Sequence, residues 1–356
     1  MTGPAERPTG ERLRIATYNV EWFNALFDDD GRLLADGERS ARHNISRAEQ
    51  AGALGIVFTA LDADAVMVIE APDSGSRRST VRALEHFAKA FDLRTRRAIS
   101  GFVSETEQEI ALLYDPDRMT PRHAPLGDPV GKKGSPAAPR FDGTFRLDGV
   151  GDAGAALIRF SKPPLELAVT TAHGHRLRMI GVHAKSKAPH GARTPEEATQ
   201  ISILNRHKQL AECRWLRARV ETHLARGDDL LVMGDFNDGP GLDAYEKLFG
   251  HSGVELVLGV DVPPEAQLYD PHAAMARAGR MNMMPTTARF WLNPQQRYFE
   301  ALLDFIMVTP RLAALKPAWR IWHPWNDPAC LQTPELHQAL LQASDHFPVT
   351  IDLVLL

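Results

Sequence analysis

Polar side chains with catalytic potential stand at or near the ends of several short apolar stretches of this chain. They are Asn19, Glu70, His183, Asp235 with Asn237, Asp304, and Asp345 with His346. Layered α/β folds commonly carry catalytic groups at strand ends and in the loops that follow them. Taken alone, each has an ordinary explanation, such as a turn for Asn19, a solvated strand end for Glu70 or a satisfied core position for His183. The whole series is hard to explain as solvation, and it predicts one shared polar site.

The sequence around the acids indicates what such a site would do. Glu70 directly follows a buried apolar run, where a carboxylate is costly unless it is paired or bound to a metal. Asp235 and Asn237 are two residues apart, so an extended chain would point both the same way. Asp304 interrupts an apolar run and needs a partner, for which a histidine is an obvious choice. A carboxylate beside a metal, with a histidine held by a second carboxylate, supplies the charge stabilisation and proton handling that phosphodiester hydrolysis requires.

The elements that would position these groups form runs of strands with a few helices between them. Strands are expected over residues 13–20, 65–69, 110–114, 156–160, 165–170, 177–182, 230–233 and 348–354, with those of 156–182 in a meander. Helices are expected over residues 47–60 and 77–91, and from the Thr194 cap to residue 225. Residues 286–292 and 298–308 can pair as a hairpin around 293–296, whereas 121–155 should be a surface excursion with one or two short strands and 251–285 should be irregular. The pattern favours one α/β (α+β) domain over residues 13–356, with stacked sheets and outer helices, behind a disordered leader at 1–12.

Composition limits the class of protein. The chain has 356 residues, 44% of them hydrophobic, and its two cysteines are too few for a disulfide framework. The N-terminus has no apolar signal-peptide core, and no run of about 18 apolar residues exists, so we expect a cytoplasmic protein without membrane contact or an evident obligate protein partner. The net charge of −4 argues against a tight, non-specific nucleic-acid binder. Nucleic acid stays open as a substrate, because a bound divalent cation can supply local positive charge.

Five short motifs carry the polar residues along the chain. The most specific are Gly-Asp-Phe-Asn at 234–237 and Ser-Asp-His-Phe-Pro-Val at 344–349, with Ile-Glu at 69–70, Val-His-Ala-Lys-Ser-Lys at 182–187 and Leu-Leu-Asp-Phe-Ile at 302–306 in support. Together they resemble the endonuclease/exonuclease/phosphatase superfamily, which includes DNase I-like nucleases, over about residues 13–354. The resemblance implies a four-layer α/β/β/α sandwich of two packed mixed sheets, with the site at one end.

The resemblance also implies a metal site. Glu70 looks like the principal Mg²⁺ ligand, helped by Asn19 and Asp345. Hard oxygen ligands suit this ion, which keeps several waters and binds through one or two carboxylates plus a phosphate. Mn²⁺ could substitute for it, and the number of metal ions stays open.

The remaining motif residues resemble the groups that act on water and phosphate. Asp235 and Asn237 are similar to the pair that positions the attacking water and the phosphate. His346, oriented by Asp304, resembles the histidine that acts as general base or as a donor to the phosphoryl oxygens. His183 resembles a second histidine, on the leaving-group side or on the phosphate. The identity of the group that takes the proton of water stays open.

Lys162, Lys185 and Lys187 are candidate substrate-binding residues. Lys162 stands in Phe-Ser-Lys-Pro-Pro, where relatives often carry arginine, and lysine keeps the charge but loses the planar fork. Lys185 and Lys187 follow the His183 stretch, where a polyanion would pass, although a solvated loop charge is the ordinary alternative for each. Aromatic residues that could stack on bases, with burial in the core as the alternative, are Trp22, Phe23, Trp291, Trp322 and Trp325.

Three functions are compatible with this site. The first is a Mg²⁺-dependent phosphodiesterase, most readily a nuclease on DNA or RNA, that uses in-line attack of water. The second is a phosphoesterase for a small or lipid substrate of the inositol phosphate or sphingomyelin type, although no amphipathic membrane helix is evident. The third is a non-catalytic binding module, which loss of Glu70, Asp235 or His346 would mark, and all three are present. The phosphate-contacting tyrosine of abasic-site endonucleases has no clear match, which counts against a dedicated repair role.

Overall fold

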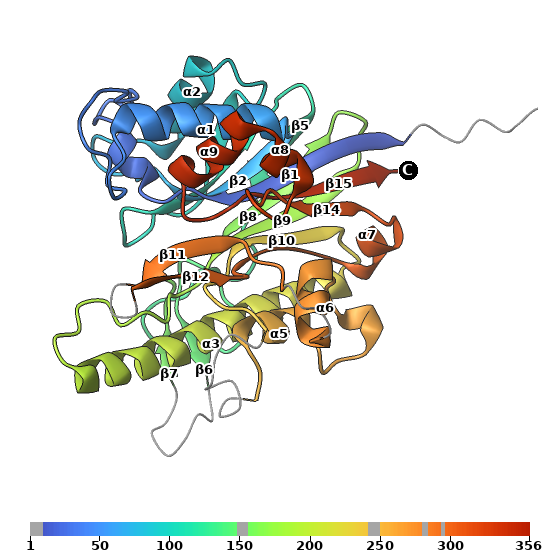
Figure 1. The fold of residues 1–356 in the computed structure, drawn as a ribbon. Helices are drawn as coiled ribbons and strands as arrows, with labels where there is room; N and C mark the ends of the chain where they lie inside the picture. The colour runs from blue at the N-terminus through green and yellow to red at the C-terminus, as the bar shows by residue number, and fades with distance from the viewer. Residues whose placement is uncertain (1–9, 148–155, 241–249, 280–283, 293–295) are drawn as a thin grey trace, which may run out of the picture.

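The computed structural model describes residues 10–147, 156–240, 250–279, 284–292 and 296–356 (Figure 1). Residues 1–9 of the expected leader lie outside the described residues, and the first strand begins at Glu11, two residues earlier than the expected start at Leu13. Two large mixed sheets pack face to face, and helices cover the outer face of each (Figure 1). This arrangement confirms the predicted four-layer α/β/β/α sandwich.

Six strands form the first sheet, in the order β14 (Ala318–Ile321), β15 (Val349–Leu355), β1 (Glu11–Asn19), β2 (Ala65–Ala71), β4 (Glu109–Tyr114) and β3 (Arg97–Ser100). β1 and β2 run parallel with Asn19 opposite Ile69, so Asn19 and Glu70 emerge at the same end of the sheet. β15 runs antiparallel to β1. The loop before β15, which carries Asp345 and His346, therefore reaches this end as well.

Five strands form the second sheet, in the order β13 (Asp304–Val308), β10 (Leu230–Asp235), β9 (Arg176–His183), β8 (Leu165–Thr171) and β5 (Met119–His123). The parallel strands β9 and β10 place His183 opposite Asp235. The antiparallel pair β10 and β13 places Asp235 opposite Asp304. Three predicted site residues therefore lie in one row across adjacent strands at the end of this sheet.

Apolar side chains fill the layer between the sheets, with Ile15 and Met67 from the first sheet packed among Met179, Leu231 and Ile306 from the second. The outer face of the first sheet is covered by α1 (Arg47–Leu61), α2 (Thr80–Ala90), α8 (Pro328–Gln332) and α9 (Pro334–Ala343). The second sheet is covered by α3 (Pro195–Ala225), α5 (Gly253–Leu258) and α6 (Pro271–Ala278). Strands covered on both faces are apolar throughout, which is why β2 and β10 read as continuous hydrophobic runs.

The segment after residue 285 differs from the expected hairpin. β11 (Ala288–Leu292) and β12 (Arg297–Ala301) do pair, and residues 293–295 between them lie outside the described residues. The prediction of a second strand over residues 298–308 was wrong, because the observed strand β12 ends at Ala301. Leu302 and Leu303 interrupt the strand, and β13 joins β10 in the second sheet. The run of 301–308, which is hydrophobic except for Asp304, concealed this boundary.

Two other expectations need correction. The strand expected at 156–160 is β7 (Ala156–Ile158), which pairs with β6 (Phe145–Leu147) in a small separate sheet and is not part of the meander of β8 and β9. The 251–285 stretch is not irregular in its described part, since it holds α5, η2 (Pro264–Ala266) and α6, and Ser252 and Glu255 form a capping box at α5. Residues 148–155 of the 121–155 excursion lie outside the described residues. Also unexpected were η1 (Phe23–Leu26), α7 (Pro310–Ala314), β3, β14, α8 and α9.

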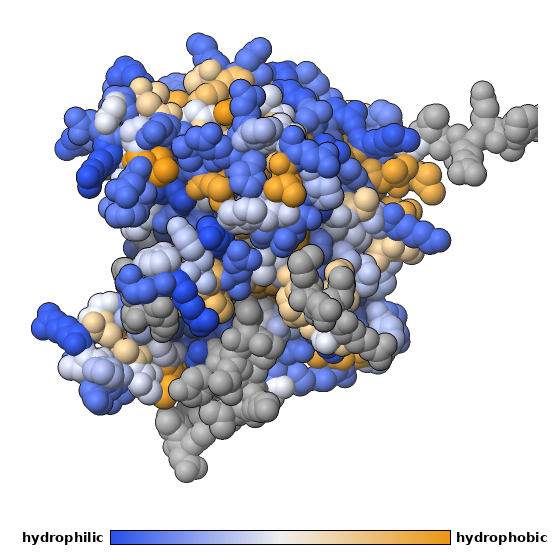
Figure 2. Space-filling view, viewed as in Figure 1, coloured by the Kyte–Doolittle hydropathy of each residue, from blue (hydrophilic) through white to orange (hydrophobic). Residues whose placement is uncertain are grey.

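The surface is mostly hydrophilic on the face shown in Figure 2, and apolar residues there form small separate groups. Scattered apolar residues of this kind are normal on a protein surface. No helix among the described residues has the length and apolarity needed to cross a membrane.

Gly234 sets the path of the chain just before Asp235. Its φ is +138°, and a Cβ at this position would lie 2.0 Å from the carbonyl oxygen of Val182 on β9. We predict that Gly234→Ala lowers the free energy of unfolding by at least about 2 kcal/mol, because backbone strain and overpacking both oppose the substitution. Chemical denaturation measures the change.

Gly52→Ala in α1 is the matched control for this substitution. Nothing lies within 4 Å of a Cβ added at Gly52. Alanine also favours the helix more than glycine does, so this variant should be as stable as the wild-type protein or more stable. A Gly234→Ala protein that unfolds at the wild-type denaturant concentration would contradict the prediction.

Candidate active site

An irregularity in β2 turns Glu70 into the site. The pairing of β2 with β4 shifts register between Ile69 and Ala71, and Glu70 between them has a left-handed φ of +60°. Bulges of this kind re-aim side chains next to active sites. Burial of the carboxylate raises the pKa of Glu70 to about 7, and the nearby charge of Lys162 only partly opposes this. Glu70 is therefore a buried acid whose negative charge needs further compensation.

His183 lies at the end of β9 among three charged side chains. Lys162 Nζ donates a hydrogen bond to His183 Nε2 at 3.0 Å and another to Gln108 Oε1 at 3.2 Å. The same Nε2 is 3.6 Å from Asp235 Oδ2 and 3.8 Å from Glu70 Oε1. Burial, together with the charge of Lys162, lowers the pKa of His183 well below its ordinary value. His183 is therefore a neutral imidazole that accepts a hydrogen bond from the ammonium group.

Asp235 is held at the centre of the row by amide groups of Asn19 and Asn237. Asn19 Nδ2 donates to Asp235 Oδ2 at 3.0 Å, and the backbone N–H of Asn237 donates to Asp235 Oδ1 at 2.7 Å. Asn237 Nδ2 also donates to Asp235 Oδ2 at 3.1 Å. Burial raises the pKa of Asp235 to about 6, although the positive charge of His346 opposes the shift. The carboxylate therefore has a fixed orientation and a pKa close to neutral pH.

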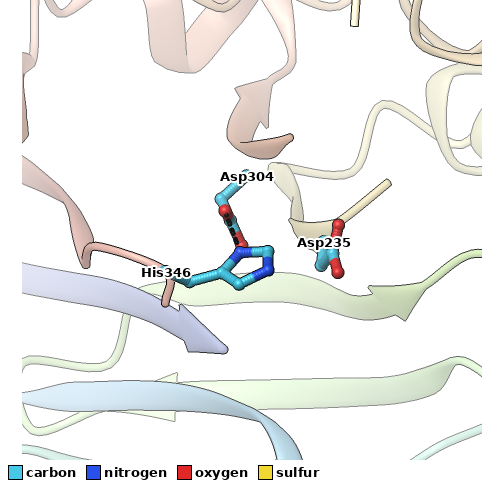
Figure 3. Close-up of side chains that lie close together, drawn as sticks. All are labelled: Asp235, Asp304 and His346. Atoms are coloured by element: carbon cyan, nitrogen blue, oxygen red, sulfur yellow. Dashed lines mark hydrogen bonds and ion pairs between the residues drawn. The ribbon is translucent and has the colours of Figure 1, made fainter. Parts of the chain in front are cut away.

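Asp304 and His346 form the closest ionic contact of the site. His346 Nδ1 lies 2.7 Å from Asp304 Oδ2, and Figure 3 shows the imidazole between Asp304 and Asp235. Thr287 Oγ1 donates to the same Asp304 oxygen at 2.8 Å and accepts from the backbone N–H groups of Leu303 and Asp304. Burial disfavours the charged imidazole, but the adjacent Asp304 carboxylate outweighs this and raises the pKa of His346 well above its ordinary value. His346 is therefore an imidazolium at neutral pH.

Asp235, Asp304 and His346 are also close enough to one another to hold a metal ion, since one ligand atom from each lies within 4.8 Å of the others. Their chemistry argues against this use. A protonated imidazole cannot ligate a metal, and His346 Nδ1 is already engaged by Asp304. The geometry suits a proton-carrying pair that faces a second acid.

A hard cation fits better beside Asn19 and Glu70. The Oδ1 atom of Asn19 is buried and has no hydrogen-bond partner among the described residues. The partly exposed Asp345 carboxylate is close enough to raise the pKa of Glu70. One amide oxygen and two carboxylates at the same end of the sheet form a donor set of the kind that Mg²⁺ prefers.

The structure brings most of the sequence-predicted residues into this one site. Direct contacts link Asn19, Glu70, Lys162, His183, Asp235, Asn237, Asp304 and His346. Asp345 Oδ1 lies 4.0 Å from His346 Nε2. The charge of Lys185 acts on His183, whereas Lys187 is paired with Asp238 rather than with the site carboxylates.

Two site residues were not found from the sequence. Gln108 contacts Lys162 from the loop before β4, and its Thr-Glu-Gln-Glu surroundings look like any solvated loop. Glu212 on α3 accepts the backbone N–H of Lys185 at 2.8 Å, and burial raises its pKa to about 7. A glutamate on the buried face of a helix was the available signal for Glu212. Thr287, which directly precedes β11, is a further partner of Asp304.

Comparisons with known proteins identify the family of this chain. The model of the Endonuclease/Exonuclease/phosphatase family matches residues 16–346. An endonuclease/exonuclease/phosphatase family protein from Bacteroides thetaiotaomicron is similar at 15% identity and a TM-score of 0.50, over 97% of this chain and 95% of that chain. TDP2 from Caenorhabditis elegans is similar at 14% identity and a TM-score of 0.49, over 97% and 74% of the two chains. The 3′-5′ exonuclease NExo from Neisseria meningitidis is similar at 15% identity and a TM-score of 0.48, over 96% of this chain and 100% of that chain.

No curated protein matches the sequence. The Bacteroides structure supports the fold, and the family match extends from β1 to the loop before β15. The matched range includes every predicted site residue from Asn19 to His346. The chain therefore belongs to the Endonuclease/Exonuclease/phosphatase family and is a phosphoric-ester hydrolase of the divalent-metal-dependent kind that this family represents.

Proposed function

We propose that this chain is a Mg²⁺-dependent phosphodiesterase that hydrolyses nucleic acid by in-line attack of water. The observation that supports this most directly is the Asp304–His346 pair, which faces the amide-held Asp235 beside the buried Glu70. These groups offer what phosphodiester hydrolysis needs in one place, namely a cation site, an oriented base for water and a donor for the phosphoryl oxygens.

Asn19, Glu70 and Asp345 would hold the cation. When bound, Mg²⁺ supplies positive charge that compensates the negative charge developing on the phosphoryl oxygens. Two features of this chain favour the assignment: Asn19 Oδ1 has no hydrogen-bond partner among the described residues, and the Glu70 carboxylate is largely buried. Mn²⁺ also accepts oxygen ligands and could take the same place.

His346 acts as a donor in this proposal. Asp304 keeps the imidazole protonated at neutral pH, since the pKa of His346 lies well above its ordinary value. An imidazolium cannot take a proton from water, but it can donate a hydrogen bond to an oxygen that gains negative charge. Of the two roles left open for this histidine, the donor role is the one that its protonation supports.

Asp235 is the better candidate for the base. Its pKa of about 6 lies close to working pH, where a general base is most effective. The hydrogen bonds from Asn19 and Asn237 fix the direction in which its oxygens point. A carboxylate fixed in this way can hold the attacking water in line with the bond that breaks.

Lys162 and His183 complete the site on the side of Asp235 away from Asp304. The row across β9, β10 and β13 places His183 and Asp304 on opposite sides of Asp235. The Lys162 ammonium group, held by Gln108 and the neutral imidazole, supplies positive charge to a phosphate or to the departing oxygen. His183 keeps that ammonium group in place.

Metal removal and loss of Asp235 should each stop hydrolysis. We expect the protein with Mg²⁺ to cleave plasmid DNA, single-stranded DNA or RNA, EDTA to abolish cleavage, and Asp235→Asn to lower kcat by roughly 10²-fold or more. Asp352→Asn is the control, since Asp352 is an exposed acid paired with Arg14 far from the site and its loss should leave kcat unchanged. Equal activity of Asp235→Asn would refute the site, and turnover of cyclic dinucleotides or phospholipids alone would move the substrate to small or lipid phosphoesters.

Asp304→Ala should lower kcat by at least roughly tenfold, towards the 10²–10⁴-fold range typical of acid–base groups. Without the carboxylate, His346 loses the partner that orients it and keeps it protonated. NMR titration of His346 in this variant should show its pKa falling, because the carboxylate that opposes burial most strongly is gone. Asp304→Asn keeps the shape and removes the charge, so it should lower the pKa in the same direction. Unchanged kcat and an unchanged histidine titration would refute the pairing.

Magnesium affinity should fall as the solution becomes more acidic. The pKa of Glu70 is about 7, so below that pH a proton must leave before the cation binds. We expect the apparent affinity to drop by roughly tenfold for each pH unit below about pH 7 and to level off above about pH 8. Titration of Mg²⁺ against the thermal unfolding temperature at several pH values measures this.

The pKa of Glu70 has a second consequence for the metal-free protein. Folded Glu70 keeps a proton that an unfolded glutamate, with its ordinary pKa of 4.5, releases, so this residue makes the folded state less stable as the pH rises from about 4.5 to about 7. Glu70→Gln is the control and should remove both pH effects. Magnesium affinity that is the same at pH 6 and pH 8 would show that Glu70 is not a ligand.

A further inference from the structure

Three aromatic side chains beside the active site are exposed rather than buried. The exposed fractions are 45% for Trp291, 53% for Tyr298 and 36% for Trp325, whereas Trp322 is buried in the core. The structure therefore separates Trp291 and Trp325, which can contact a ligand, from Trp322, which cannot. We refer to Trp291, Tyr298 and Trp325 as the aromatic row.

The members of the row contact one another directly or through the guanidinium group of Arg289. The rings of Trp291 and Tyr298 meet edge to face, with centroids 5.0 Å apart. The guanidinium group of Arg289 lies 3.5 Å from the Tyr298 ring and 4.6 Å from the Trp325 ring, and so joins them. Trp325 is further held by His337, whose ring packs edge-on at 5.6 Å. The row is thus preformed, and a ligand would lose little entropy in ordering it.

The other face of the hairpin carries its core contacts. In the β11–β12 register, Phe290 faces Phe299, and both line a cavity of about 190 Å³ together with Asn237. Trp291 and Tyr298 project from the opposite face, because side chains alternate along a strand. Packing of the hairpin onto the domain therefore does not explain the outward aromatic side chains. The region over β11 and β12 in Figure 2 is pale to blue, without a large aliphatic patch.

The row is fixed to the catalytic loop by backbone hydrogen bonds. The N–H of Arg289 donates to the carbonyl oxygen of Asp345 at 2.7 Å, and Ala288 forms a β-bridge with His346. The ring of Phe347, the next residue, lies 6.5 Å from that of Trp325. A ligand stacked on the row would therefore continue directly into the site that holds Asp345 and His346.

One cation, Arg289, lies among the aromatic faces of the row. Its guanidinium group also pairs with Glu300 at 3.3 Å, whereas the alternation of side chains along β12 places the exposed Arg297 on the other face of the hairpin, with Phe299. Flat aromatic faces beside cations are the arrangement that binds the bases and phosphates of single-stranded nucleic acid, because every unpaired base offers a π-face. Bases inside a duplex are stacked on one another and cannot use such a surface.

We propose that the aromatic row binds unpaired bases of single-stranded nucleic acid next to the phosphate that is hydrolysed. The proposal rests on the proposed nuclease function and narrows its substrate to nucleic acid with a single-stranded segment at the site. Trp291 and Tyr298 supply the stacking faces, Arg289 supplies positive charge for the backbone of the nucleic acid, and the Arg289–Asp345 hydrogen bond sets the distance from the stacked base to the catalytic loop.

The test measures binding without cleavage. Fluorescence anisotropy in EDTA compares labelled oligomers of about 12 nucleotides, within the usual site size, as single-stranded DNA, single-stranded RNA, duplex DNA and a base-free sugar–phosphate chain. We expect the single strands to bind more tightly than the duplex and the base-free chain. Trp291→Leu and Tyr298→Ala should each weaken single-strand binding by roughly 5- to 100-fold, and Trp291→Phe, which keeps a stacking face, should retain most of the affinity.

Tyr269→Ala is the matched control. Tyr269 is 44% exposed and packs edge-on against Trp319 at 5.7 Å, as Tyr298 does against Trp291, but it lies away from the hairpin next to Val308. The Tyr269→Ala protein should bind single strands with the affinity of the wild-type protein. Thermal unfolding of each variant separates lost stacking from lost folding.

The outcomes distinguish this proposal from the proposed function. Equal affinity for the base-bearing and base-free chains, or unchanged affinity in folded Trp291→Leu, would overturn the role of the row while cleavage of nucleic acid could stand. Base-dependent binding with no cleavage of any nucleic acid in Mg²⁺ would support the row and overturn the nuclease. A difference between the DNA and RNA arms identifies which single strand is preferred.

Discussion

The buried acids at the end of the second sheet are hydrogen-bonded to side chains that arrive from the first. Asn19 at the end of β1 donates to Asp235 of β10 at 3.0 Å, and His346, in the loop before β15, lies 2.7 Å from Asp304 of β13. A buried carboxylate without such partners is strongly unfavourable. Correct packing of the two sheets and assembly of the site therefore depend on each other, since a shift of one sheet against the other would remove Asn19 from Asp235 and His346 from Asp304.

In the metal-free protein, the acids of the site outnumber its cations. The acids Glu70, Asp235 and Asp304 face two cations, Lys162 and His346, and burial disfavours the charged forms of Glu70, Asp235, Lys162 and His346. Two of the carboxyl groups respond with raised pKa values, about 7 for Glu70 and about 6 for Asp235. Perturbed groups of this kind gather at functional sites because the same desolvation that costs stability strengthens interactions with a charged ligand. A divalent cation beside Glu70 would replace its proton and compensate the charge of the carboxylate.

Strand ends were predictable because an acid or imidazole that follows an apolar run can be recognised along the sequence, without knowledge of the fold. Asn19, Glu70, His183, Asp235 and Asp304 all stand where such a run stops or starts, and the sheets place them together. Features set by pairing between strands were not predictable. The register shift at Glu70, the break at Leu302 and Leu303 and the ion pair of Lys187 with Asp238 depend on neighbours far away in the chain. Gln108 was not predicted as a site residue for the same reason, since only the folded structure brings it into contact with Lys162.

If the proposed nuclease function holds, affinity for the polyanionic substrate comes from a source other than the overall charge of the protein. With a net charge of −4, the chain gains little from the counterion release that drives most nucleic-acid binding. Stacking depends far less on the charge of the protein, and Trp291, Tyr298 and Trp325 offer exposed faces for it beside the catalytic loop. A catalytic centre built from carboxylates, amides and imidazoles recognises the phosphate group and carries little information about what the phosphate joins. Selectivity for a base-bearing chain therefore has to lie outside that centre, and the β11–β12 hairpin, bonded to Asp345 through Arg289, is the element placed to supply it.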